Sequence, residues 1–148
     1  MEVINRVLPN GAQMAGFLEN PEEGPIYMVN LLKLKEKAEY PDGRATDLTG
    51  AQAFGIYGQA VAKILMELGG GLMFSASIQS VWLGEVEEPW DAIAIGMYPN
   101  RKTLHDMLSS ADYQDIVIHR TAGLAGQLNI ETTDPSGMWL MRGGDSQS

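Results

Sequence analysis

The feature that most constrains the fold is a pair of strand-like segments with apolar or small side chains on both faces. In residues 25–34, PIYMVNLLKL, both alternating rows are mainly apolar. In residues 90–98, WDAIAIGMY, one row is isoleucine and methionine, and the other is alanine and glycine. Successive side chains of a strand point to opposite faces of the sheet. Both faces of the sheet that holds these strands must therefore be covered.

The other segments alternate between helical and strand patterns. Apolar side chains at spacings of three and four predict helices, and alternation predicts strands. The predicted order is a strand at 25–34, a helix at 50–68, a strand at 72–83 with an irregular phase near its end, a strand at 90–98, a helix at 101–110, a helix from Ser110 or Asp112 to Gly123, and a strand at 126–131. This order is the split βαβ pattern. We predict an α+β, ferredoxin-like βαββαβ protomer with a four-stranded antiparallel sheet.

The predicted helices cover one face of this sheet, and the chain has none left for the other face. A second copy of the same sheet is the natural cover, so we expect an isologous homodimer that forms through the open face. Two facing sheets would make a dimeric α+β barrel. The small row Ala92, Ala94 and Gly96 admits either a closely packed helix or a ligand. Helix packing is the favoured interpretation.

The ends of the chain are predicted to lie outside this domain. We divide the sequence into an N-terminal helical extension at 1–23, the ferredoxin-like domain at 24–131 and a C-terminal tail at 132–148. The extension holds a short amphipathic helix at 9–20. The tail carries the apolar cluster Met138–Met141, which would dock onto the domain or onto a second subunit. Residues 35–49 are polar with a Pro-Asp-Gly turn, and we interpret them as an exposed loop in which Arg44 is the residue of interest.

Charge and composition exclude several classes of function. The chain has 10 basic and 19 acidic residues, a net charge of −9. Nucleic acid is disfavoured as a partner because backbone binding requires clustered Lys and Arg; an anionic membrane surface is disfavoured for the same reason. There is no cysteine, so thiolate catalysis and cysteine-ligated zinc are excluded. We find no signal-peptide pattern and no apolar run near the roughly 20 residues of a membrane span, and expect a soluble, cytoplasmic protein.

His119 is the side chain best suited to acid/base chemistry near neutral pH. Arg120 follows it, and neighbouring helical residues do not share a face. In the functional interpretation Arg120 binds an anion, while His119, with Asp91, transfers a proton. In the structural alternative, which we favour, His119 stabilises the end of its helix as a cation, and Arg120 pairs with a carboxylate such as Asp91.

Further polar and aromatic residues are candidate substrate contacts. Trp90 forms an aromatic wall beside Asp91, and Tyr57 and Tyr98 carry hydroxyls that donate either to a substrate oxygen or to the backbone. Asn30 interrupts an apolar row, so its amide must find partners; neighbouring backbone is the simpler choice and a ligand the other. A metal site is not supported by the two histidines. No dinucleotide fingerprint or nucleophile elbow is present, so we expect no cofactor.

Several blocks, in the right order, resemble one known family. They are GPIYMVNLLKLK, YGQAVAKIL before GGG, WDAIAIGMYPNRKTLHDML and SADYQDIVIHRTAGLAGQLNI. The chain resembles the domain of unknown function 1330 family over about residues 24–131. The resemblance implies a ferredoxin-like protomer of the dimeric α+β barrel superfamily, in which the matching His-Arg pair is characteristic. Related barrels include cofactor-free monooxygenases, haem-handling proteins and small-acid isomerases or decarboxylases.

Three functional hypotheses follow from the sequence. The first is a cofactor-independent enzyme that acts on a small apolar or aromatic carboxylate. The second is a non-enzymatic dimer that binds a small ligand or regulates another process. The third is a purely structural dimer whose polar residues are all satisfied internally. A cavity beside Tyr57, Asp91 and His119 would separate the first two hypotheses from the third.

Overall fold

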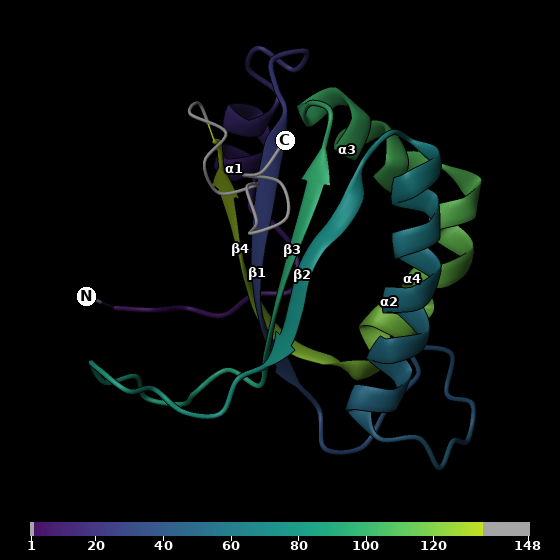
Figure 1. Cartoon of the computed structure of the whole chain (residues 1–148). Helices are drawn as coiled ribbons and strands as arrows, with labels where there is room; N and C mark the ends of the chain where they lie inside the picture. Colours follow the sequence, from purple (N-terminus) through teal and green to yellow (C-terminus); the bar gives the residue numbers. More distant parts are fainter. Residues whose placement is uncertain (1, 135–148) are drawn as a thin grey trace, which may run out of the picture.

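One four-stranded antiparallel sheet organises the chain (Figure 1). The structure is a computed structural model that describes residues 2–134. The sheet has the order β2-β3-β1-β4, which is ferredoxin-like, as predicted. The strands are β1 (Ile26–Leu34), β2 (Gly71–Ser77), β3 (Ala92–Tyr98) and β4 (Leu124–Thr132). The helices are α1 (Gly11–Phe17), α2 (Gly50–Glu67), α3 (Arg101–Ser109) and α4 (Ala111–Gly123).

Polar side chains fix the start of each helix. Asn10, Thr49, Asn100 and Ser110 each accept a hydrogen bond from a backbone N–H in the first turn of α1, α2, α3 and α4, respectively. In α1 and α2 a glutamine of the first turn also accepts from the cap's own N–H, which completes a capping box. Each cap contributes about 1 kcal/mol. These local interactions explain why the helix starts were readable from sequence.

The long helices α2 and α4 lie together on one face of the sheet (Figure 1). The small row of β3 belongs to this face, because a Cβ placed on Gly96 would lie 3.5 Å from Cδ2 of Leu65 in α2. The predicted packing of a helix on this row is therefore confirmed. At the other end, a Cβ on Gly123 would lie 2.8 Å from the backbone nitrogen of Phe54, so α4 approaches α2 at backbone distance.

The opposite face of the sheet is apolar and has no described helix over it (Figure 1). Residues paired across neighbouring antiparallel strands point to the same face. Val29 pairs with Ile95 on one side and Ile130 on the other, and Phe74 also pairs with Ile95. The side chains of Phe74 and Ile130 are 53% and 45% exposed. This open face comprises Val29, Leu31, Phe74, Ala76, Ile93, Ile95, Met97, Leu128 and Ile130.

Residues 35–49 form the predicted surface loop, with most of its residues exposed, but the loop is anchored at two of them. Ala38 and Tyr40 are buried and pack with Ala53 of α2 and Ala122 of α4. The backbone nitrogen of Glu39 donates to the carbonyl of Ala122 at 2.9 Å. The sequence did not predict this anchoring, which needs only two apolar residues within a polar run.

Arg44, the residue of interest in this loop, is held locally. Its guanidinium forms an ion pair with Asp42 at 2.6 Å and lies over the ring of Tyr40, 4.8 Å from the centroid. Arg44 thus contacts its own loop.

The second strand is shorter than the predicted 72–83. It ends at Ser77, and its irregularity falls between Leu72 and Phe74 rather than near its end. Residues 78–91, called the arm below, leave the sheet and project away from α2 and α4 at the lower left of Figure 1. The amide of Ile78 donates to the carbonyl of Asp91 at 2.9 Å and closes the base of the arm. The irregular phase predicted near the end of this strand falls within the arm.

The N-terminal residues run beside β4 and end in α1, a shorter helix than the predicted 9–20. Arg6 forms an antiparallel bridge with Gln127, which covers part of the free edge of β4. Arg101 donates to both carboxylate oxygens of Glu131 and also to the carbonyl of Glu19, so it ties the end of α1 to β4. None of the helices in residues 2–134 combines the length and apolar character of a membrane span. The predicted Met138–Met141 cluster lies outside the described residues.

Candidate functional site

A polar cluster lies on the helix-facing side of β1 and β4, with Asn30 at its centre. The Asn30 amide nitrogen donates to the carbonyls of Met28 and Ala94 at 3.2 and 3.1 Å. Its amide oxygen accepts from Gln127 Nε2 at 2.5 Å and from Asn129 Nδ2 at 2.6 Å. The expected bonding of Asn30 to neighbouring backbone is confirmed. The same side chain also holds Gln127 in one orientation.

Arg120 joins this cluster from α4. Its Nη2 donates to Gln127 Oε1 at 2.9 Å and to the carbonyl of Val7 at 2.8 Å. Both acceptors are neutral. The expected ion pair between Arg120 and Asp91 is not formed, since Asp91 lies 3.7 Å from the Lys33 ammonium instead.

Arg120 differs from the other part-buried cations of the described chain because it forms no ion pair there. Those cations, Lys33, Lys35 and Arg101, each form an ion pair with a carboxylate. Within residues 2–134, no carboxylate lies at ion-pair distance from Arg120. This is unusual in a chain with a net charge of −9. A guanidinium held by neutral acceptors keeps its full attraction for an added anion.

The remaining N–H groups of Arg120 are not fully buried. Neither Nε nor Nη1 donates to a described residue. No side-chain nitrogen or oxygen that is buried in the described part of the chain lacks a hydrogen-bond partner. Because Nε and Nη1 have no such partner, they cannot be fully buried. Arg120 therefore presents accessible donors from a position that Gln127 and Val7 fix.

Three tyrosines lie on α2, α4 and the end of β3, and Tyr57 is close enough to Arg120 for its charge to act on the phenol. The hydroxyls of Tyr57 in α2 and Tyr113 in α4 lie 3.3 Å apart, and their rings meet edge to face. Burial raises the pKa of Tyr57 well above its usual range, Tyr113 raises it further, and the positive charge of Arg120 opposes the rise. Burial, with Tyr113, raises the pKa of Tyr98 to about 12. Tyr57 and Tyr98 are therefore neutral hydroxyls at neutral pH.

His119 and Asp91 lie in different surroundings. The His119 ring bonds through Nδ1 to the hydroxyl of Tyr40, a residue of loop 35–49, at 2.8 Å. The carboxylate of Asp91 accepts from the Leu34 amide at 2.7 Å, just before β3 begins. The predicted divergence of His119 and Arg120 is confirmed, since they contact different residues. The described residues show no contact between His119 and Asp91, which the functional interpretation expected to act together.

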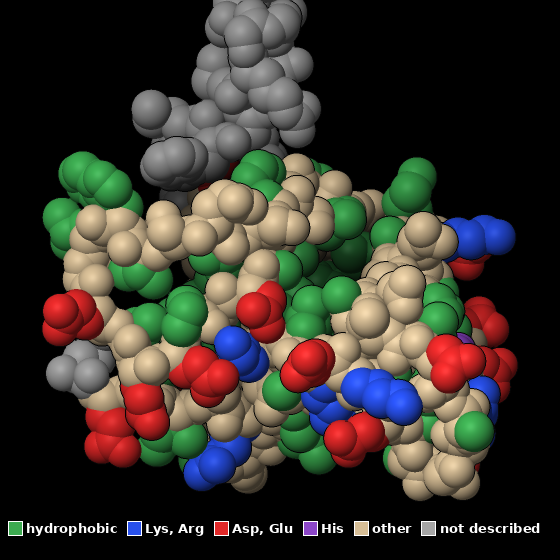
Figure 2. Space-filling model, turned by 90° about the horizontal axis from the view of Figure 1, so that it is seen from below, with side chains coloured by type: hydrophobic (Ala, Val, Ile, Leu, Met, Phe, Trp, Pro, Cys, Tyr) green, Lys and Arg blue, Asp and Glu red, His purple; other side chains and the backbone are tan. Residues whose placement is uncertain are grey.

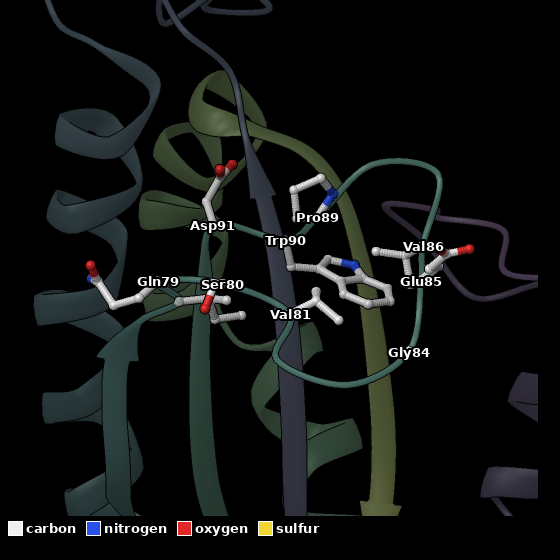
Figure 3. A pocket seen from close by; sticks show the side chains of 10 residues that line it. Gln79, Ser80, Val81, Gly84, Glu85, Val86, Pro89, Trp90 and Asp91 are labelled. Carbon is white, nitrogen blue, oxygen red and sulfur yellow. The ribbon is translucent and has the colours of Figure 1, made fainter.

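Trp90 lies apart from the Arg120 cluster and helps to line a hollow. Its Nε1 donates to Asn5 Oδ1 at 2.9 Å. The concave side of the arm encloses an open hollow of about 540 Å³, lined by residues 78–81, 84–86 and 89–91. Figure 3 shows the Trp90 indole and the Asp91 carboxylate pointing in different directions at its rim. A second hollow, of about 400 Å³, lies at residues 20–23.

Neither hollow touches Tyr57, His119 or Arg120, so neither is the single cavity that the sequence suggested. Seen from below, apolar side chains are also recessed near the middle of the molecule (Figure 2). In the described residues, no group of three or more histidine and acidic side chains is placed to hold a metal ion.

Sequence reasoning missed three residues that take part in these contacts, namely Gln127, Tyr113 and Tyr40. Gln127 links Asn30 to Arg120, and Tyr40 bonds His119. A signal for Gln127 existed, because β4 alternates Gln127, Asn129 and Glu131 with apolar residues. No pattern announced Tyr40, which comes from the loop that the sequence suggested was exposed.

Comparison with known proteins gives a family but no activity. No family model matches the chain, and no curated protein matches it. The crystal structure of RPA0582, a protein of unknown function from Rhodopseudomonas palustris, is similar at 30% identity with a TM-score of 0.77, covering 88% of this chain and 98% of that one. Methylated RPA0582 gives 32% identity and a TM-score of 0.78, covering 89% and 98%. The chain belongs to the same family as RPA0582.

A more distant structure shares the fold alone. It is At3g17210 from Arabidopsis thaliana, with 11% identity and a TM-score of 0.50, covering 76% of this chain and 97% of that one. At this level of identity the likeness concerns backbone topology and says nothing of the site.

The buried tyrosines predict a specific response to alkaline pH. Folding keeps the phenols of Tyr57 and Tyr98 neutral, whereas unfolded tyrosine ionises near pH 10. Their contribution to the free energy of unfolding is complete below about pH 10 and is lost above it, as the pH rises through about 12 for Tyr98 and further still for Tyr57. Absorbance titration of the phenolates should show a late-ionising fraction that shrinks in Tyr57→Phe and again in Tyr98→Phe. Ionisation of all tyrosines together near pH 10, as in urea, would contradict this expectation.

Proposed function

We propose that the protein binds a small, largely apolar or aromatic carboxylate through Arg120. The observation that carries the proposal is a part-buried guanidinium fixed by two neutral acceptors, with no carboxylate at ion-pair distance in residues 2–134. The net charge of −9 repels anions from the molecule as a whole. A small acid would therefore bind only where a local cation outweighs that repulsion.

The surroundings of Arg120 suit the two ends of such a ligand. Its accessible N–H groups would donate to the carboxylate, in the geometry that guanidinium groups favour. Tyr57, on which the charge of Arg120 acts, is a neutral donor in the same region. The Tyr57 ring would contact the apolar part of the ligand. Asn30 and Gln127 would act by holding the guanidinium in place.

The active form that we propose is a homodimer formed through the open face. The nine apolar residues of that face form one continuous surface across all four strands. Contiguous apolar surfaces of this kind on a soluble chain mark interaction sites. The same surface on a second copy is self-complementary under two-fold symmetry. The two sheets would then enclose a dimeric α+β barrel.

A second candidate function is cofactor-independent acid/base catalysis on the same class of ligand. The Tyr40 hydroxyl fixes the His119 ring at 2.8 Å, and His119 is adjacent in sequence to Arg120. A fixed imidazole is suited to moving a proton on a ligand that reaches it. This candidate ranks second because Asp91, the predicted partner, bonds to Leu34 and Lys33 instead.

Two further assignments belong with the proposal. The sequence blocks quoted above support membership of the domain of unknown function 1330 family. The cytoplasmic location remains a prediction from the sequence.

The dimer predicts that a charge at the centre of the open face separates the protomers. Ile95→Lys would place an ammonium between two apolar sheets, where an unpaired charge is strongly disfavoured. Light scattering at micromolar concentration should give a dimeric mass for the wild-type protein and a monomeric mass for this variant. Ile56→Lys, on an exposed position of α2, should remain dimeric. A monomeric wild-type protein would refute the proposed dimer.

The carboxylate site predicts that Arg120→Gln weakens binding of benzoate or phenylpropionate about 10-fold or more, since a hydrogen-bonded charge is lost. Titration calorimetry measures this. Benzamide, which lacks the charge, should bind both proteins weakly and equally. Lys63→Gln removes one positive charge from an exposed site and should leave binding unchanged.

Arg120→Gln also removes contacts to Val7 and Gln127, so the result needs a check on folding. Arg120→Lys keeps the charge but not the fork of donors, and should bind with intermediate affinity. Thermal melts of both variants identify any loss of folded protein. Undiminished benzoate binding by folded Arg120→Gln would contradict the proposal.

His119→Gln distinguishes catalysis from binding alone. If His119 transfers a proton, the variant should bind small acids with wild-type affinity but lose turnover across a panel of carboxylates and quinols. Calorimetry and a product screen would be run on the same preparations. Full turnover by the variant would eliminate His119 as the acid or base, and a wild-type protein without turnover would leave the binding function alone.

A further inference from the structure

The arm is an ordered projection with a fixed base. The amide of Ile78 bonds to the Asp91 carbonyl, and the amide of Asp91 bonds to the Leu32 carbonyl at 2.7 Å. The Lys33 ammonium donates to the Pro89 carbonyl and pairs with Glu88 at 3.3 Å. These contacts close the base of the arm and tie its C-terminal end to β1. The tip therefore projects without a large ordering cost on binding.

The tip of the arm is apolar and exposed. Val81, Trp82 and Leu83 are consecutive, and the Trp82 and Leu83 side chains are 91% and 79% exposed. Exposed apolar residues that stand together mark contact sites more often than single ones do. Tryptophan is also among the residues that contribute most to binding between proteins.

The direction of the arm relates this tip to the open face. The arm extends on the side of the sheet away from α2 and α4, the side on which the open face lies (Figure 1). The N-terminal segment extends on the same side and carries further exposed apolar residues, Ile4 and Leu8. A second copy seated on the open face would meet both projections.

We propose that Trp82 and Leu83 bury against a second copy of this chain, so that each protomer holds its partner with its arm. The inference rests on the proposed homodimer and extends it beyond the sheet. An isologous dimer would use both arms equally. The charges disfavour an anionic membrane or a nucleic acid as the occupant, because Glu85, Glu87 and Glu88 lie in the same arm of a chain with a net charge of −9.

Photo-crosslinking tests this contact directly. Trp82 would be replaced by the photoreactive residue benzoylphenylalanine, and ¹⁵N-labelled and unlabelled protein would be mixed and allowed to exchange subunits. Peptides crosslinked from position 82 should then include pairs with one labelled and one unlabelled partner. The same photoreactive residue at Ile56, exposed on α2, should give no such mixed pairs.

The outcomes distinguish failure of the arm from failure of the dimer. A dimeric preparation without mixed pairs from position 82 would overturn the arm contact and leave the sheet-mediated dimer standing. A monomeric preparation by light scattering would overturn both. Trp82→Ser with Leu83→Ser should raise the dimer dissociation constant at least about 10-fold by dilution light scattering. An unchanged constant would also count against the arm, as would Trp82-dependent sedimentation with phosphatidylserine-containing vesicles.

Discussion

The structure depends on the pairing of β1 with a neighbour on each side. Its register with β3 and β4 places Asn30 opposite Ala94 and Asn129, and thereby gathers the polar cluster on the helix-facing side. The same register aligns Val29 with apolar residues on the other face. A shift of one residue would exchange the two faces. One strand thus sets both the polar site and the proposed dimer surface.

The two faces have different physical consequences. On the helix-facing side, amides hold one another and then hold Arg120, so the guanidinium is fixed without being neutralised. On the open side, apolar residues have no described helix over them (Figure 1). The first arrangement suits an anionic small molecule, and the second suits another copy of the protein. Membership of the same family as RPA0582 does not distinguish between these two kinds of partner, since RPA0582 is a protein of unknown function.

Elements governed by local signals could be predicted from the sequence, whereas those governed by distant contacts could not. Helix caps such as Thr49 and Asn100 act within one turn, and α2 and α3 begin at the predicted residues 50 and 101. The bond between Gln127 and Arg120 depends on where β4 meets α4, which alternation does not reveal. Tyr40 reaches His119 only because loop 35–49 folds over two helices. The end of β2 at Ser77 was hidden because the alternation continued into the arm.

A crystal structure of the protein with benzoate is the most direct test of whether Arg120 binds a small carboxylate. If Arg120 binds the ligand, density for the carboxylate should lie within hydrogen-bond distance of its guanidinium. Density for the ring should lie between the sheet and the helices. Gln127 should keep its contact with Asn30 in that complex. Benzoate bound only at another surface, with no contact to Arg120, would contradict the proposed carboxylate site.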